Sequence, residues 1–179
     1  NVSIKISSLY AKTDPIDTAG SIDGLVEALR PLLLKARENG VLVNFDMEQF
    51  ALKDLTLELF MRCCEEIDFQ AGIAMQAYLR SGDEDAARII EWSKRTGRQV
   101  TVRLVKGAYW DTEIKHAQVE GLDGYPVFTQ KPASDVSFIA LSRRLLGMTD
   151  RLYPQFATHN AHSVAAILEM AAAVGTDHF

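Results

Sequence analysis

The feature that most constrains the fold is a regular alternation of strand-like and helix-like segments along the chain. Strand-like segments carry apolar residues with a period of two, and helix-like segments carry them at helical spacing. The predicted strands are Val2–Ser7, Val41–Asp46, Gly72–Tyr78, Val100–Val105 and Gln155–Asn160. Strands that alternate with amphipathic helices favour parallel pairing through right-handed crossovers. The predicted class is therefore α/β, with about five βα units.

Helical segments follow each predicted strand. They begin at Ser21, Leu52, Asp83, Glu113, Ser134 and Ser163. The first is expected to bury an apolar stripe of Ile22, Leu25, Val26, Leu29, Leu32, Leu33 and Ala36. Such units fit either an open doubly wound sheet or part of a (β/α)₈ barrel of the TIM type. No G-x-G-x-x-G motif follows the first strand, so the dinucleotide signature of the open sheet is missing. The polar residues described below favour the partial barrel.

Composition excludes several classes of protein. The chain has 179 residues and a net charge of −5, without the basic stripe of a nucleic-acid surface. No apolar run approaches the roughly 20 residues that span a bilayer. Cys63 and Cys64 lie in an apolar-periodic helix and are expected to be core thiols. The chain starts within a strand, without an initiator Met or a leader, which is the pattern of an excised segment.

Each predicted strand carries one polar residue on the face opposite its clearest apolar row. These residues are Lys5, Asp46, Gln76, Arg103 and His159. A buried polar group without a partner costs about 1–3 kcal/mol of stability. Five such groups would therefore be strongly destabilising unless they bind a common ligand. In a barrel they would converge at the C-terminal mouth, where such folds keep their active sites. The pattern predicts a shared ligand site.

The residue types in this set narrow the chemistry. There is no second carboxylate for glycoside hydrolysis, no cluster at metal-ligand spacing, no nucleophile elbow and no phosphate-binding loop. The pair His159 and His162 spans a strand end and a helix start, so we do not expect it to bind metal. A cation-rich site with aromatic walls and no strong nucleophile suits an anionic, planar cofactor that performs the chemistry itself.

The segment Val100–Asp111, with the sequence VTVRLVKGAYWD, provides most of these features. It starts as a strand and breaks at Gly107. The break delivers Lys106, Tyr109 and Trp110 just beyond the strand. Because α/β folds bind ligands at this edge of the sheet, these side chains are candidates for the site.

Long motifs in the chain resemble the proline dehydrogenase domain of the bifunctional PutA flavoproteins. The matching stretches are VRLVKGAYWD, EGLDGYPVFTQKPASDVSF, YPQFATHNAHSV, SIKISSL and VNFDMEQ. The resemblance implies a distorted (β/α)₈ barrel with FAD across the C-terminal strand ends. It implies oxidation of L-proline to Δ¹-pyrroline-5-carboxylate, with electrons passed to membrane quinone. Residues 1–179 would form part of that barrel, with one strand before Asn1 and two strands and the last helix after Phe179. This segment alone is expected to be inactive.

The resemblance also assigns roles to individual residues. Lys5 would meet the substrate carboxylate, Asp46 would hold Lys5 in place and Tyr109 would close over the substrate. Arg103 would lie beside the N5 edge of the flavin. The residues expected to bind the cofactor are Gln76, Arg103, Val105, Lys106, Gly107, Ala108, Trp110, Gln130, Lys131, Thr158, His159 and Asn160. Gln130 stands where the family motif has arginine.

The same resemblance implies partners and a location. A pyrroline-5-carboxylate/glutamate-semialdehyde dehydrogenase, fused or separate, would take the product. The enzyme would be cytoplasmic and associate peripherally with the bacterial inner membrane. Two alternatives stay open from the residues alone. One is an aldolase-type barrel with Lys5 or Lys106 as a Schiff-base nucleophile. The other is an inactive barrel fragment.

Overall fold

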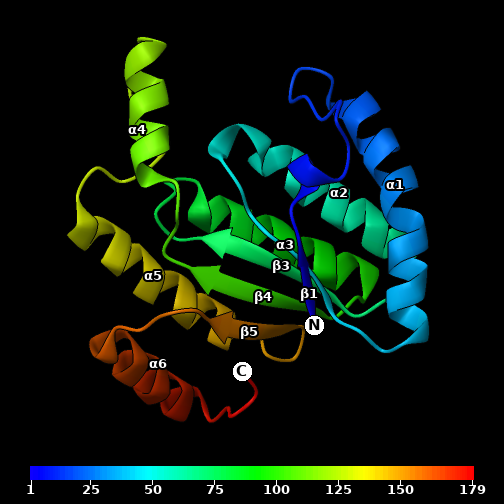
Figure 1. Ribbon diagram of the computed structural model, residues 1–179. Coiled ribbons are helices and arrows are strands. Elements are labelled where there is room, and N and C mark those ends of the chain that lie inside the picture. The colour runs from blue at the N-terminus through cyan, green and yellow to red at the C-terminus, as the bar shows by residue number, and fades with distance from the viewer. The chain divides into compact units, whose positions relative to one another are not determined.

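Five short β-strands alternate with helices through residues 1–179, all of which the computed structural model describes (Figure 1). The strands follow one another in the sheet in chain order, β1-β2-β3-β4-β5. This order lacks the reversal of a doubly wound sheet. The α/β class is confirmed, and closure into an eight-stranded barrel stays a prediction. The chain divides into two compact units, Asn1–Ala74 and Met75–Phe179.

The first unit contains three parallel strands. They are β1 (Val2–Ile4), β2 (Val43–Phe45) and the start of β3 (Ala71–Gln76). Val43 pairs with Val2 on one side and with Ala71 on the other. The 3₁₀ turns η1 (Ile6–Ser8) and η2 (Phe50–Leu52) follow the first two strands.

Two helices complete the first unit, α1 (Thr18–Glu38) and α2 (Lys53–Glu66), and they pack against each other. The apolar stripe predicted for α1 is buried through Ile22, Leu25, Val26, Leu29, Leu33 and Ala36. Leu32 is only half-buried. On α2, Phe60 packs edge-on against Phe45 of β2, with ring centroids 5.4 Å apart. These contacts form the apolar core of this unit.

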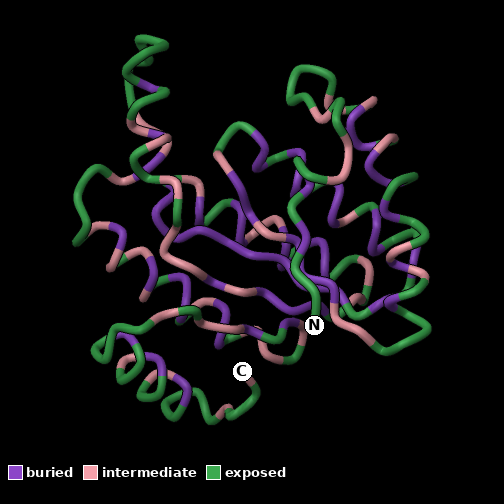
Figure 2. Tube along the Cα trace, viewed as in Figure 1, coloured by how far each residue is buried: buried purple, intermediate pink, exposed green.

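The second unit contains the parallel strands β4 (Val100–Val105) and β5 (Leu152–Phe156). Its helices are α3 (Gly82–Thr96), α4 (Trp110–Val119), α5 (Lys131–Leu146) and α6 (Ala161–Val174). Helix α5 packs against both strands and against α3 and α6. Figure 1 shows α4 standing away from α5 and α6, and Figure 2 shows that its far end is exposed.

Several strand boundaries differ from the prediction. The first two strands are shorter, because the chain turns into η1 after Lys5 and because β2 pairs only over Val43–Phe45. Strand β5 spans Leu152–Phe156, so the predicted strand Gln155–Asn160 began three residues too late and ended four residues too late. Pro154 weakens the local strand signal because proline is uncommon in central strands. It is tolerated in β5, which ends the described sheet and pairs only with β4 there.

None of the α-helices combines the length and the apolar character that a membrane-spanning segment needs.

Candidate functional site

In the first unit, the ends of β1 and β2 place a lysine beside a carboxylate. Lys5 Nζ lies 3.4 Å from Asp46 Oδ2. The other carboxylate oxygen accepts a hydrogen bond of 3.2 Å from Asn44 Nδ2. The Lys5 side chain is 51% exposed and that of Asp46 is 27% exposed. The Lys5 ammonium is therefore accessible to solvent, and the Asp46 carboxylate is held in place by the buried Asn44 amide.

A second acid in this segment was missed. Glu48 is buried, and its carboxylate accepts hydrogen bonds from Ser7 N at 3.1 Å and Ser7 Oγ at 2.5 Å. Glu48 lies in the loop after β2, where the alternation of a strand no longer applies, so the strand pattern gave no signal for it. Glu48 ties η1 to the end of β2 and so supports the loop that carries Lys5.

In the second unit, Arg103 points to the face of β4 opposite its buried apolar row. Arg103 pairs in register with Gln155 of β5, and its Nε donates to Gln155 Oε1 at 3.3 Å. The polar residue that β5 presents beside Arg103 is therefore Gln155, which was not predicted. His159 lies three residues past the strand, in a loop where His159 and Asn160 are exposed and Thr158 is half-buried.

Lys106 follows β4 directly and turns toward α5. Its Nζ lies 2.5 Å from Asp135 Oδ1 and 5.6 Å from the centroid of the Phe138 ring. Lys131 binds the other oxygen of Asp135 at 2.7 Å. Hydrogen bonds from Lys106, which contributes most, and from Lys131 hold the pKa of the Asp135 carboxyl below its usual value. Asp135 is thus the anchor of both predicted cofactor lysines.

Gly107 forms the turn between β4 and α4. Its φ of +131° is a conformation that favours glycine, and a Cβ there would lie 2.5 Å from the Tyr78 ring. Two residues before Gly107, Val105 O accepts a hydrogen bond of 2.8 Å from Ala77 N, which follows the buried Gln76 at the end of β3. Gly107 therefore brings the backbone tightly over Tyr78.

The residues after the turn are more exposed. Ala108 is exposed and Tyr109 is half-buried. Trp110 begins α4, is 40% exposed, and its Nε1 donates to Phe128 O at 2.9 Å. This bond ties α4 to the segment that leads into α5, where Gln130 is the N-cap.

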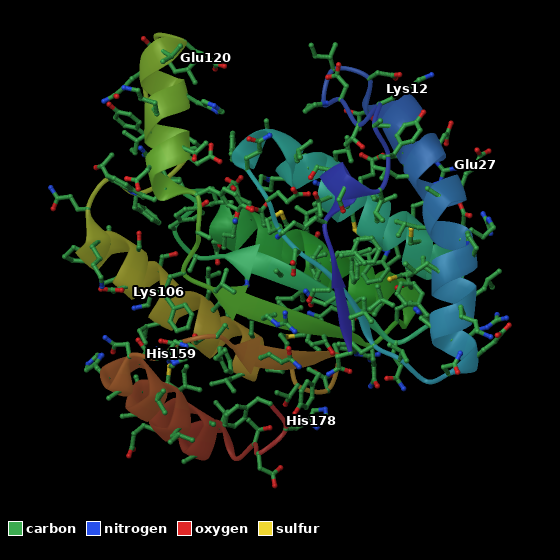
Figure 3. The ribbon with its side chains drawn as sticks, viewed as in Figure 1. Lys12, Glu27, Lys106, Glu120, His159 and His178 are labelled. Carbon is green, nitrogen blue, oxygen red and sulfur yellow. The ribbon has the colours of Figure 1, made fainter.

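A cavity of about 440 Å³ opens where α5 and α6 begin. The lining residues are Lys106, Pro132, Asp135, Val136, Ile139, Asn160, His162 and Ser163. Figure 3 shows Lys106 and His159 in this part of the unit. Asn160 caps α6 by accepting from Ser163 N at 3.0 Å. Helix N-termini carry partial positive charge and attract anions, so this region suits a phosphate-bearing group.

The structure therefore brings the predicted residues together in two sets. Lys5 and Asp46 form one set in the first unit, and the remaining predicted residues belong to the second unit. That all of them face one pocket stays a prediction. Both lysines of the aldolase reading donate to carboxylates, whereas a Schiff-base lysine is activated by an apolar pocket or a neighbouring cation. No group of three or more His, Cys, Asp or Glu side chains is arranged to hold a metal ion.

Comparison with known proteins identifies a family over the whole chain. The family model described as proline dehydrogenase matches residues 1–179. The bifunctional protein PutA of Klebsiella aerogenes is 39% identical over 174 residues, which cover 95% of this chain and 13% of the relative. Proline dehydrogenase 1 of Bacillus subtilis is 28% identical over 144 residues, covering 80% of this chain and 41% of the relative.

Solved structures agree with this result. PutA from Bdellovibrio bacteriovorus, inactivated by N-propargylglycine, superposes with a TM-score of 0.94 at 38% identity, covering 98% of this chain and 19% of the other. A PutA structure with proline bound in remote sites gives a TM-score of 0.92 at 38% identity and covers 99% of this chain and 18% of the other. This chain thus spans less than a fifth of the PutA chains that it matches.

Proposed function

Because the chain belongs to the proline dehydrogenase family, we propose that it forms part of an enzyme that oxidises L-proline to Δ¹-pyrroline-5-carboxylate. The observation that carries the proposal is the family match over residues 1–179, which agrees with the motifs that first suggested the family. The PutA relatives are much longer than this chain, so the whole reaction depends on a larger protein.

The residues present fit FAD, the cofactor of these flavoenzymes. Its diphosphate would lie near the starts of α5 and α6, where Lys131 and His159 are exposed and a cavity adjoins Asn160. Its ring system would lie at the end of β4 near Arg103, with Gln76, Val105, Gly107, Ala108, Trp110 and Thr158 around it. Lys106 and Lys131 share the Asp135 carboxylate, so together these three groups carry the net charge of one cation. The His159 imidazole and the two helix N-termini would add hydrogen-bond donors and partial positive charge for the diphosphate.

FAD, when bound, would supply the acceptor for the hydrogen and two electrons removed from the proline carbon next to nitrogen. The chain's own task is orientation and charge balance. Arg103, held by Gln155, would offer a fixed positive charge to an electron-rich ring edge. Lys5 would bind the substrate carboxylate, and Asp46 would keep the Lys5 ammonium aimed by their contact at 3.4 Å. Tyr109 would cover the substrate.

The further partners follow from the family. Electrons would pass to a membrane quinone, and the product would go to a pyrroline-5-carboxylate/glutamate-semialdehyde dehydrogenase, fused as in bifunctional relatives or separate. The enzyme would be cytoplasmic and associate peripherally with the bacterial inner membrane.

Purification of the full-length protein that contains this segment would test the proposal. We expect the visible absorption of bound oxidised flavin, and bleaching of that absorption by L-proline without oxygen. Borohydride treatment with carbonyl substrates should trap nothing on Lys5 or Lys106. A colourless protein, or a bound flavin that L-proline does not reduce, would refute the proposed flavin-dependent reaction.

A further inference from the structure

Tyr78 lies directly beneath the turn that delivers Tyr109. A Cβ built on Gly107 would lie 2.5 Å from Tyr78 Cδ1 and Cγ, so only the absence of a side chain lets the turn approach the ring this closely. The Tyr109 backbone N–H donates to the Tyr78 hydroxyl oxygen at 3.3 Å. One side chain therefore touches the turn at two points, a ring face and a hydrogen-bond acceptor.

The backbone of Tyr78 holds two further segments. Its N–H donates to Lys106 O at 2.8 Å, and its carbonyl accepts from Phe128 N at 2.8 Å. Phe128 in turn accepts the Trp110 indole N–H through its own carbonyl. Tyr78 is thus bonded to the end of β4, to the turn after it, and to the segment that anchors Trp110.

The ring is also part of a small apolar cluster. Tyr78, Leu79 and Val127 are buried together, and Ile114 of α4 and Tyr125 pack against them. Burial raises the pKa of the Tyr78 phenol to about 12. The phenol therefore stays protonated over the physiological range, and its oxygen is a permanent neutral acceptor for the Tyr109 amide.

We propose that Tyr78 is a positioning residue, which sets the conformation of Gly107–Tyr109 and thereby the place of the Tyr109 side chain over the substrate. The inference rests on the proposed function for the role of Tyr109, and the contacts themselves stand without it. The Tyr78 side chain acts through the backbone of its neighbour, because its hydroxyl is directed to the Tyr109 N–H.

Tyr78→Phe in the full-length holoenzyme tests the hydrogen bond while keeping the ring under Gly107. Loss of the acceptor leaves the Tyr109 N–H without its partner, so we expect the KM for L-proline to rise about fivefold, with kcat changed less than about twofold. Tyr125→Phe is the matched control, since it removes a hydroxyl from the same cluster. It should leave both constants and the flavin content unchanged.

A second background separates positioning from general support of the fold. In Tyr109→Ala, the side chain that Tyr78 is proposed to place is absent, so adding Tyr78→Phe should not raise KM further. An equal rise in both backgrounds would overturn the proposal, as would an unchanged KM in the single variant.

Hydrogen exchange supplies a readout independent of catalysis. The Tyr109 amide should exchange about fivefold faster in Tyr78→Phe than in the parent protein. Unchanged exchange would refute the positioning role even in a protein that does not oxidise proline. If Tyr109→Ala itself leaves KM unaltered, the error lies in the proposed function of Tyr109, and the exchange result still decides the contact.

Discussion

The Lys106 ammonium lies 2.5 Å from the Asp135 carboxylate, which joins the end of β4 to the first turns of α5. Lys131 binds the same carboxylate from the helix itself. Two lysines expected to serve the cofactor are therefore held by one acid. Their arrangement on the surface of the second unit depends on Asp135.

Asp135→Asn is expected to lower stability modestly at neutral pH. The pKa of Asp135 is lowered in the folded state, so its contribution is present above the unfolded value, near 3.8, and is lost as pH falls through the folded value. The Asp135 side chain is 37% exposed, so the contribution should stay below about 1 kcal/mol and shrink with salt. Urea unfolding at pH 7 and pH 3 checks this. A stability gap between parent and variant that is no smaller at pH 3 than at pH 7 would contradict it.

Gly107→Ala should damage the second unit more than an average surface change. The positive φ and the Tyr78 ring both oppose a Cβ, with an expected cost of about 1–3 kcal/mol and weaker flavin retention. Thermal unfolding and flavin content measure the two effects. Gly124→Ala is the control, because a Cβ there meets nothing within 4 Å. Equal melting temperatures for the two variants would show that the turn adapts.

Asp46→Ala should reduce proline turnover more than stability in the full-length enzyme. Lys5 is half exposed, so loss of its partner should cost less than about 1 kcal/mol of stability. Turnover should fall at least about tenfold because the Lys5 ammonium is no longer aimed. Asp23→Ala removes an exposed acid on α1 that pairs with Arg62, and it should leave turnover intact. Unaltered turnover in Asp46→Ala would refute the role.

Gln130→Arg should strengthen flavin retention. Gln130 is the exposed N-cap of α5 beside Lys131, so an added cation would face the proposed diphosphate site. At an exposed position the expected gain in affinity is about threefold, and it should fall with ionic strength. Lys131→Gln should weaken retention by a similar factor. Titration of the apoprotein with FAD measures the affinity of both variants. An unchanged affinity in both would mean that the diphosphate binds elsewhere.

Much of the fold was predictable because it depends on local patterns. The alternation in Val100–Val105 predicted both ends of β4 correctly, because successive side chains of any strand point to opposite faces of the sheet. The stripe on α1 was predicted for the same reason, with only Leu32 less buried than expected. Long motifs identified the family, because they preserve residue types at fixed spacing.

The end of β5 was not predictable from such a pattern. Pro154 interrupts the local signal, and the register with β4 decides that the strand stops at Phe156. His159 thus moves from a strand to a loop, and Gln155 takes the position beside Arg103. Pairing between distant segments determines strand ends, and a single segment does not carry that information.

The sequence by itself determined the order of elements, the family and the residue types of the site. Only the tertiary structure decided which of these residues hold one another. Lys106 and Asp135 are far apart in sequence, as are Tyr78 and Gly107, and each pair meets because packing of helices and strands brings distant segments into contact. Periodicity reports which face a side chain takes, because it follows from local backbone geometry. Periodicity does not report which residues a side chain contacts on that face, because those contacts depend on the rest of the chain.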